Sequence, residues 1–384
     1  MGLPRRSDII DRGRRWVPQN GDFGAITIRN EQSFMVPGFT WGDSFTGNYE
    51  LKATDTANGE TWTVNTYITN PTFNWSSNQG GTVSVRFPAP LVNFVCRAQN
   101  VKSVTMTKVS KWTDLAQIRL DANNLEAVTT GVWPSLNTLC LYTNAPLLQV
   151  KTFDWPNLKY CYISNTGITS FETKEWPELL NFDLNGCINL AGTINTYDWP
   201  KLETLNTKGA TSLENFDLSH EWPNMTLLDL AYNAIEDADT FTTNNGWVSL
   251  TSFNCYNMTA TVNTLETHSE WVNLEQFVWT HANTVNMTLH PEWVNCDFLY
   301  LRNNNFSAGK PTISSGFPLS YVNLVSCSMN ATEIDEALIE VDACGTSNGI
   351  MYTTLNPGSG ASNRSPTANT AIANLIGRGW TVTY

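Results

Sequence analysis

The sequence predicts a mainly β fold in which short parallel strands stack into a solenoid, between an antiparallel β-rich N-terminal domain and an α/β C-terminal cap. Three observations predict this fold. A tryptophan-marked phrase recurs every 21–25 residues along the middle of the chain. Short alternating apolar runs precede this region, and two amphipathic helical patterns, each followed by a strand pattern, come after it.

The repeated phrase places apolar residues at positions +3, +6 and +8 after each marker, and often Asn or Cys at +11. Leu136, Leu139, Leu141 and Asn144 show this pattern after Trp133. Some copies drift: Asn165 comes one residue early, and the copy after the last marker is shifted by one. The markers are Trp112, Trp133, Trp155, Trp176, Trp199, Trp222, Trp247, Trp271, Trp293 and Phe317.

This phrase resembles the leucine-rich repeat, and its ten copies cover roughly residues 96–330. The resemblance implies one short strand per repeat, with all strands paired in one parallel sheet on the concave side. Strand alternation turns the +6 and +8 side chains inward. The Asn at +11 should turn inward to satisfy backbone groups at a tight bend, and an inward Cys is a smaller substitute. The segments opposite the sheet should be loops or short turns.

Each marker tryptophan should stack under the same residue of the next repeat and fill the side opposite the sheet. A tryptophan ladder that stacks on carbohydrate is the alternative interpretation. Pro follows several markers, as in Trp133-Pro134 and Trp155-Pro156, and should fix the turn that enters the strand.

The segments before and after the repeats divide the chain into further regions. Residues 1–23 form an Arg-rich segment that is either a solvated tail or a docking peptide, with an RNA-binding arm as a third reading. Residues 24–95 are expected to form the β-rich domain, 96–330 the solenoid and 331–384 the cap, because a solenoid would otherwise expose its core at its ends. The docking residues would be Arg5, Arg6, Arg12, Arg14 and Arg15.

Composition narrows the possible functions. Charged residues make up 15% of the 384 residues, below the usual quarter or so. The net charge of -13 argues against binding nucleic acid by phosphate neutralisation. No run of 18 apolar residues predicts membrane insertion, and no apolar segment follows the N-terminal arginines as in a secretory signal. The eight cysteines fall mostly at buried repeat positions, so we expect reduced structural thiols.

No motif for catalysis or for a cofactor is present. The sequence lacks G-x-S-x-G, H-E-x-x-H, P-loop and G-x-G-x-x-G patterns and a paired-carboxylate cleft. His268 and His290 lie in adjacent repeats, so a metal pair is conceivable, but we attribute their placement to a coincidence of the repeat. We therefore expect a protein that is not an enzyme and has neither metal nor cofactor.

The outward positions +5, +7 and +9 of the concave sheet are the candidate binding surface. Tyrosine supplies contact area at low entropic cost, and Asn supplies adaptable hydrogen bonds. Other outward positions include Arg119, Asp121, Ser164, Lys208 and Thr280. An ordinary solvated face that binds nothing is the alternative. The candidate binding residues are Tyr142, Tyr160, Tyr162, Asn181, Asp183, Asn206, Asp229, Asn254, Tyr256, Phe298, Tyr300 and Arg302.

The C-terminal segments 335–354 and 371–384 are similar to the ends of leucine-rich repeat proteins of Bacteroidetes bacteria and their tailed phages, which are often virion proteins. The resemblance implies a fibre, spike or tail-associated adhesin of a phage particle, assembled in the host cytoplasm. Its N-terminus would contact other virion proteins, and its repeats would contact a host-surface glycan or protein. A bacterial surface or effector-like interaction module and a purely structural virion component are the alternatives. Whether the chain forms a homo-oligomer is left open.

Overall fold

The computed structural model describes residues 91–98, 101–234, 238–258, 262–281, 283–360, 362 and 364–384, and the backbone of the strands between residues 25 and 86. The described chain is a mainly β, parallel solenoid of about ten turns, so the predicted fold class is confirmed. Two compact units divide it, residues 1–190 and residues 191–384. The arginines at positions 5, 6, 12, 14 and 15 lie outside the described residues.

Unit one begins with antiparallel pairing, as the alternating N-terminal runs predict. A six-stranded sheet has the order β11-β9-β1-β7-β4-β5, and β2 pairs with β6. The strands are β1 (Ala25–Asn30), β2 (Phe34–Met35), β3 (Gly38–Trp41), β4 (Glu50–Asp55), β5 (Thr61–Asn65), β6 (Thr72–Phe73), β7 (Gly81–Arg86), β8 (Leu91–Val95), β9 (Val101–Met106) and β11 (Ala127–Val128).

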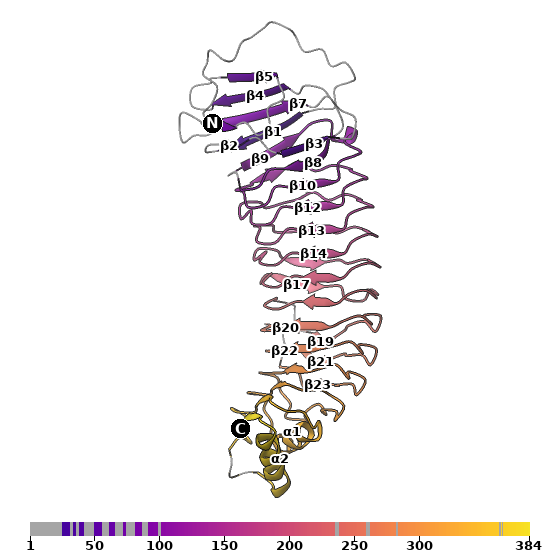
Figure 1. Cartoon of the computed structure of the whole chain (residues 1–384), viewed down its shortest axis with the longest axis vertical. Helices are drawn as coiled ribbons and strands as arrows, with labels where there is room; N and C mark the ends of the chain where they lie inside the picture. Colours follow the sequence, from indigo (N-terminus) through magenta and orange to yellow (C-terminus); the bar gives the residue numbers. More distant parts are fainter. Residues whose placement is uncertain are drawn as a thin grey trace. The chain divides into compact units, whose positions relative to one another are not determined.

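The repeats of unit one add one three-residue strand each. The parallel order is β8-β10-β12-β13-β14, and β3 pairs antiparallel with β8 (Figure 1). A 3-10 turn, Val109–Lys111, precedes the first of these repeat strands. The boundaries expected at 95 and 330 stay predictions. The repeat strands are β10 (Gln117–Arg119), β12 (Thr138–Cys140), β13 (Tyr160–Tyr162) and β14 (Asn181–Asp183).

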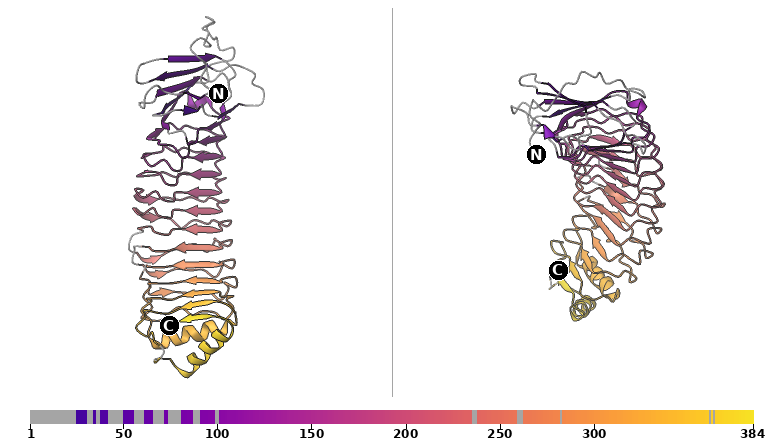
Figure 2. Two further views of the ribbon diagram at one scale, coloured as in Figure 1. Left: turned by 60° about the vertical axis from the view of Figure 1, so that its left-hand side comes forward. Right: turned by 45° about the horizontal axis from the view of Figure 1, so that its top comes forward.

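Unit two continues the same construction, and its strands lie one above another (Figure 2). The parallel order is β16-β18-β20-β22-β24-β25-β26-β27. The strands are β16 (Thr204–Asn206), β18 (Leu227–Asp229), β20 (Ser252–Cys255), β22 (Gln276–Trp279), β24 (Phe298–Tyr300), β25 (Tyr321–Asn323), β26 (Ile350–Tyr352) and β27 (Thr381–Thr383).

A second row of short strands lies outside this main ladder, in segments for which the sequence predicts only loops or turns. In unit two, β15 pairs with β17, and β19, β21 and β23 pair in that order, all parallel. Successive repeats stack in register, so even irregular segments meet a neighbour whose backbone can complete their hydrogen bonds. These strands are β15 (Gly192–Ile194), β17 (Leu213–Phe216), β19 (Ala238–Phe241), β21 (Val262–Leu265) and β23 (Asn286–Met287).

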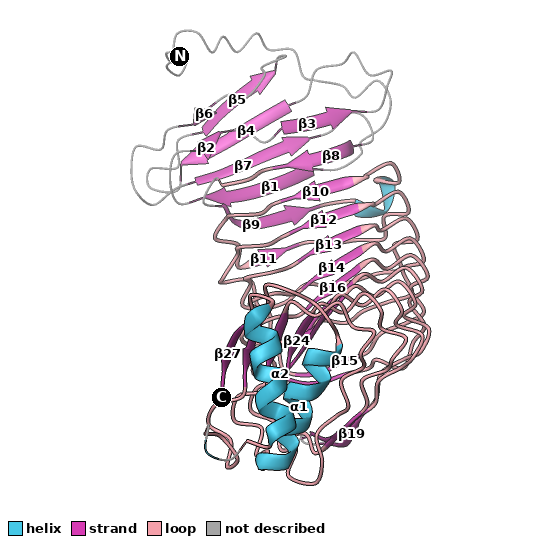
Figure 3. Ribbon diagram, turned by 60° about the horizontal axis from the view of Figure 1, so that its bottom comes forward, coloured by secondary structure: helices cyan, strands magenta, loops and turns pink. Residues whose placement is uncertain are grey.

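The C-terminal module has the predicted order of helix, strand, helix and strand. Helix α1 (Ala331–Ala343) begins with a capping box in which Asn330 and Glu333 satisfy each other's backbone amides. Helix α2 (Pro366–Gly377) begins with a Ser365 cap and a proline in its first turn. The two helices pack side by side, and α2 contacts β27 (Figure 3).

The marker tryptophans form a buried ladder, as predicted. The indole planes of Trp222 and Trp247 are 3° apart, with ring centroids separated by 5.7 Å. The indole N–H of Trp247 also donates to the carbonyl oxygen of His220, at 3.1 Å. All nine marker tryptophans are fully buried, so no carbohydrate can stack on them and the alternative interpretation is wrong.

Position +11 carries the predicted inward Asn or Cys. The Asn144 amide donates to the carbonyl oxygens of Leu120 and Leu141, at 3.0 and 2.7 Å. The Cys327 thiol donates to the Leu301 carbonyl at 3.0 Å, so it fills the same role. In the repeat where Asn165 comes one residue early, Thr166 takes the buried +11 position instead.

All eight cysteines are free thiols, and seven are buried. Burial raises the pKa of the Cys96 and Cys327 thiols to about 12. Because the thiolate is the reactive form, these thiols are structural, as the sequence predicts.

Candidate functional site

The outward side chains of each repeat are positioned by strand alternation. The +6 and +8 side chains, such as Leu139 and Leu141, are fully buried, and most of those at +5, +7 and +9 face solvent in part. Three predicted outward residues are buried instead, namely Asp121, Ser164 and Thr280. The remaining outward side chains define one sheet face in each unit.

A left-handed residue ends the outward run of each repeat at position +10. Its φ is 55° at Ala122, 57° at Thr143, 60° at Tyr232 and 65° at His281. This conformation turns the chain sharply, so the +10 side chain stands at the edge of the sheet face and the +11 side chain points inward.

In unit one, two of the predicted tyrosines lie on β13, and Tyr142 follows the end of the neighbouring strand β12. Tyr160 and Tyr162 stack with ring centroids 6.1 Å apart, and Tyr160 is 37% exposed. The Tyr142 hydroxyl accepts a hydrogen bond from Arg97 at 3.0 Å. Arg97 also forms a 2.6 Å ion pair with Asp121, which explains why this aspartate is buried. Partial burial raises the pKa of the Tyr162 phenol.

Asn181 and Asp183 also lie on the unit-one face, in β14. The Asp183 carboxylate accepts the backbone N–H of Asn185 at 3.0 Å, which is a turn-forming contact within its own repeat. Desolvation by burial raises the pKa of this carboxyl group. The structure thus gives Asp183 a role in shaping the strand end.

The same contact recurs in unit two at three predicted binding residues. Side-chain oxygens of Asn206, Asp229 and Asn254 each accept the backbone N–H two residues later, at 3.0–3.1 Å. These residues are paired neighbours in the ladder β16-β18-β20. They therefore form a row of side chains that close the strand ends.

The largest feature of the unit-two face is a cluster of aromatic side chains, which we call the aromatic patch. Phe298 and Tyr321 stack at 4.5 Å with planes 9° apart, and Tyr300 stacks on Tyr321 at 5.9 Å. Tyr256 contacts Tyr300 at 5.9 Å. Unbroken ring-to-ring contacts connect its members, which are Tyr232, Tyr256, Phe298, Tyr300, Tyr321 and Tyr352.

Half of the aromatic patch was predicted and half was missed. Tyr256, Phe298 and Tyr300 come from the outward positions of regular repeats. Tyr321 lies in the copy that is shifted by one residue. The alternation of inward and outward residues along its strand was the signal that could have identified it. Tyr352 lies in the cap, which carries no repeat marker, and Tyr232 stands at position +10, whose left-handed turn has no distinctive residue type.

Arg302 follows Tyr300 by two residues and lies on the same face. Its Nε is buried and has no hydrogen-bond partner. Its neighbour His281 contacts Tyr256 at 6.1 Å. Burial, together with the positive charge of Arg302, lowers the pKa of the His281 imidazole.

Other places in the described part of the chain offer less. No group of three or more His, Cys, Asp or Glu side chains there could hold a metal ion. Among the same residues, no helix has both the length and the apolar character needed to cross a bilayer. His290 contacts the Thr267 carbonyl at 3.0 Å, and His268 packs on Trp271.

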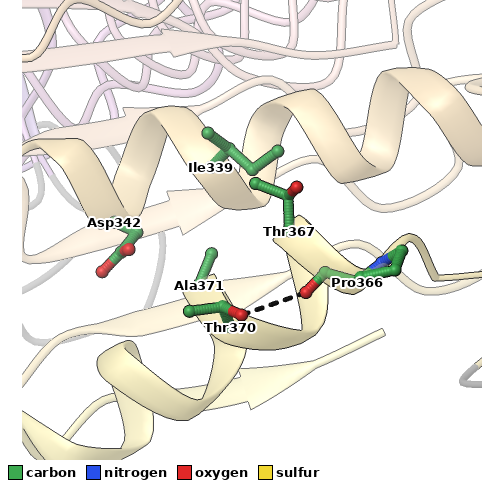
Figure 4. Close-up of a pocket in the computed structure, with 6 residues that line it drawn as sticks. All are labelled: Ile339, Asp342, Pro366, Thr367, Thr370 and Ala371. Atoms are coloured by element: carbon green, nitrogen blue, oxygen red, sulfur yellow. Dashed lines mark hydrogen bonds between the residues drawn. The ribbon is translucent and has the colours of Figure 1, made fainter.

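A hollow of about 300 Å³ lies between α1 and α2 (Figure 4). Two of its polar side chains are already engaged: Thr370 donates to the Pro366 carbonyl, and the Asp342 carboxylate accepts from Arg378 and Asn374.

The stacked strands, the inward Asn and Cys residues and the tryptophan ladder define a leucine-rich repeat solenoid. No family model and no curated protein matches the chain. Two solved structures from Listeria monocytogenes are similar to it. One is an internalin, InlF, at 13% identity over 77% of this chain and 90% of that one, with a TM-score of 0.43. The other is the functional domain of InlJ, described as including a cysteine ladder, at 14% identity over 70% and 76%, with a TM-score of 0.27. Similarity of this size says nothing about ligands or partners.

Proposed function

We propose that the chain is a binding module without catalytic activity, and that it engages a partner macromolecule through the sheet face of its repeats. The aromatic patch is the observation that carries this proposal. Six partly exposed rings in unbroken contact form a rigid, amphipathic surface, which is the chemistry of recognition surfaces.

The setting we propose is a phage particle, where the chain would be a fibre, spike or tail-associated adhesin exposed to the host. The resemblance of residues 335–354 and 371–384 to phage-borne repeat proteins supports this setting. A chain with few charged side chains, whose polar surface is rich in Asn, Thr and Ser, is consistent with an exposed particle surface. The N-terminal arginines would then attach it to other virion proteins.

Binding of the purified chain to a panel of Bacteroidetes cells tests the proposal. We expect saturable binding by the intact chain, and a loss of at least tenfold in affinity for the double substitution Tyr300→Ser and Tyr321→Ser. Tyr197→Ser is the matched control, because Tyr197 is a partly buried tyrosine of the same unit that lies off the sheet face.

The competing roles give other outcomes. If the intact chain binds no cells but associates with purified particle components, it is a structural part of a virion and the adhesin role is wrong. Specific binding to a secreted or host-derived protein, without any association with particles, would instead favour a bacterial surface or effector-like module.

A further inference from the structure

The arginines with described side chains fall into two groups. Neither Arg119 nor Arg302 forms an ion pair with a described residue, and in each the Nε is buried without a hydrogen-bond partner. Both of these arginines lie on a sheet face. The other three form ion pairs of 2.6–2.8 Å, which are Arg97 with Asp121, Arg364 with Asp335 and Arg378 with Asp342.

Arg302, like Arg119, lacks the carboxylate partner that the other three described arginines have. A guanidinium carries five N–H donors in a planar fork that matches the two oxygens of a carboxylate. Leaving a buried N–H of a charged group unpaired costs free energy. The chain has 35 acidic residues and a net charge of -13, yet no ion pair among the described residues includes Arg302.

The stacking of the aromatic patch selects among ligands. The planes of Phe298, Tyr300 and Tyr321 lie within 9° of one another, and Phe298 and Tyr321, with centroids 4.5 Å apart, cover one face of each other's ring. Sugars stack on free ring faces, and this contact leaves fewer of them. Ring edges carry partial positive charge and favour oxygen atoms, and tyrosine hydroxyls add hydrogen-bond donors.

The charged groups on the unit-two sheet face also help to select among ligands. Arg302 and Lys208 are its cationic groups, and the carboxylate of Asp229 is engaged with the backbone N–H of Ala231. Lys208 lies close enough to Asp229 to favour the charged form of this carboxylate. Beside the aromatic patch, therefore, Arg302 is a cation that forms no ion pair with a described residue.

We propose that the aromatic patch and Arg302 bind an acidic peptide segment of a partner protein, with a Glu or Asp carboxylate paired to the guanidinium. The peptide carbonyls and carboxylates would lie against the ring edges and the tyrosine hydroxyls. This inference rests on the proposed function, because it names the partner chemistry of the same sheet face.

Calorimetric titration of the full chain with a hexaglutamate peptide tests the inference, with hexaglutamine as the neutral probe. We expect binding of hexaglutamate only, and a loss of about tenfold in affinity for Arg302→Gln. Arg302→Lys should recover part of this loss, because it keeps the charge but not the fork. Lys201→Gln is the matched control, since it removes one positive charge from an exposed site of unit two off the sheet face.

Three results would overturn the inference: equal affinity of wild type and Arg302→Gln, equal affinity for hexaglutamate and hexaglutamine, or binding of hexagalacturonate in place of hexaglutamate. Circular dichroism and the thermal midpoint verify that each variant is folded. Cell binding separates this inference from the proposed function. If Tyr300→Ser with Tyr321→Ser abolishes cell binding and Arg302→Gln leaves it intact, the binding face stands and the acidic-peptide assignment falls.

Discussion

At the scale of single residues, the left-handed +10 position carries a cost that recurs along the chain. Gly186 and Gly209 adopt this conformation without penalty, but Ala122, Thr143 and Tyr232 do so with a Cβ atom. A left-handed conformation costs such residues about 1–2 kcal/mol each. The cost is tolerated because the same backbone continues the ladder, as in the hydrogen bond from the Thr143 N–H to the Ser164 carbonyl, at 2.8 Å.

Replacing Ala122 with Gly should therefore stabilise the protein by about 1 kcal/mol, since glycine removes the left-handed penalty. Ala127→Gly is the matched control, because Ala127 is also exposed but lies in β11. It should destabilise the protein by about 0.5–1 kcal/mol, since glycine weakens a strand. Urea denaturation of both variants measures the two effects, and the same sign for both would contradict the role of the +10 turn.

At the scale of elements, the +11 ladder accepts either Asn or Cys because the essential requirement is a buried donor to carbonyl oxygens. Asn144→Leu keeps the volume but leaves the Leu141 carbonyl and the Leu125 N–H unpaired, whereas the Leu120 carbonyl still accepts from Asn123. We expect a loss of about 3 kcal/mol or more in unfolding free energy. Asn144→Cys should cost clearly less, because the thiol can donate as that of Cys327 does. Chemical denaturation compares the two, and an equal loss would refute the donor requirement.

The row of side chains that closes the strand ends predicts a pH dependence at Asp229. Desolvation raises the folded-state pKa of this carboxyl group, so its ionisation opposes folding. Stability from this group is lost above the folded pKa and regained as the pH falls below the unfolded value of about 3.9. Asp229→Asn should therefore be more stable than wild type at pH 7, since Asn206 and Asn254 accept the same backbone contact.

The advantage of Asp229→Asn should shrink as the pH falls towards 3.5, which urea denaturation at several pH values measures. Asp154→Asn, at an exposed position, is the control and should change stability little at any of these pH values. An advantage of Asp229→Asn that is constant with pH would show that the charge is not its cause.

The sequence was sufficient for the elements that repeat. The spacing of the markers predicted the strands, the buried tryptophans and the inward Asn and Cys residues, because a repeat averages out local ambiguity. It could not predict the second row of strands, since β15 and β23 have no periodic pattern and pair only because neighbouring repeats are in register. The burial of Asp121 depends on Arg97, which lies before the first marker and outside the pattern.

At the scale of the whole molecule, each unit is stabilised by contacts between successive repeats, so a defect at one end acts mainly on its neighbours. In unit two the terminal module closes the last strands. Within this module the side chain of Arg364 is fully buried and forms an ion pair with Asp335 at 2.8 Å. The Asp335 carboxylate also accepts a hydrogen bond from the Ser365 N–H.

Asp335→Ala should cost about 3–5 kcal/mol, because it leaves the buried Arg364 charge unpaired. Asp342→Ala, which breaks the more exposed pair with Arg378, should cost about 1 kcal/mol. Hydrogen exchange locates the effect: faster exchange in β25, β26 and β27, with unchanged exchange in β12 and β13, is the expected result. A uniform increase throughout the chain would contradict the local character of the repeats.

The tryptophan ladder also has an optical consequence. In unit two the indoles of Trp199, Trp222, Trp247, Trp271 and Trp293 follow one another at 5.7–6.1 Å with planes 3–14° apart. At such separations the transition dipoles of neighbouring indoles couple, and an excited state migrates along the row before it emits. The native protein should therefore show a strong near-ultraviolet circular dichroism signal and depolarised emission, both of which report directly on whether the repeats are stacked.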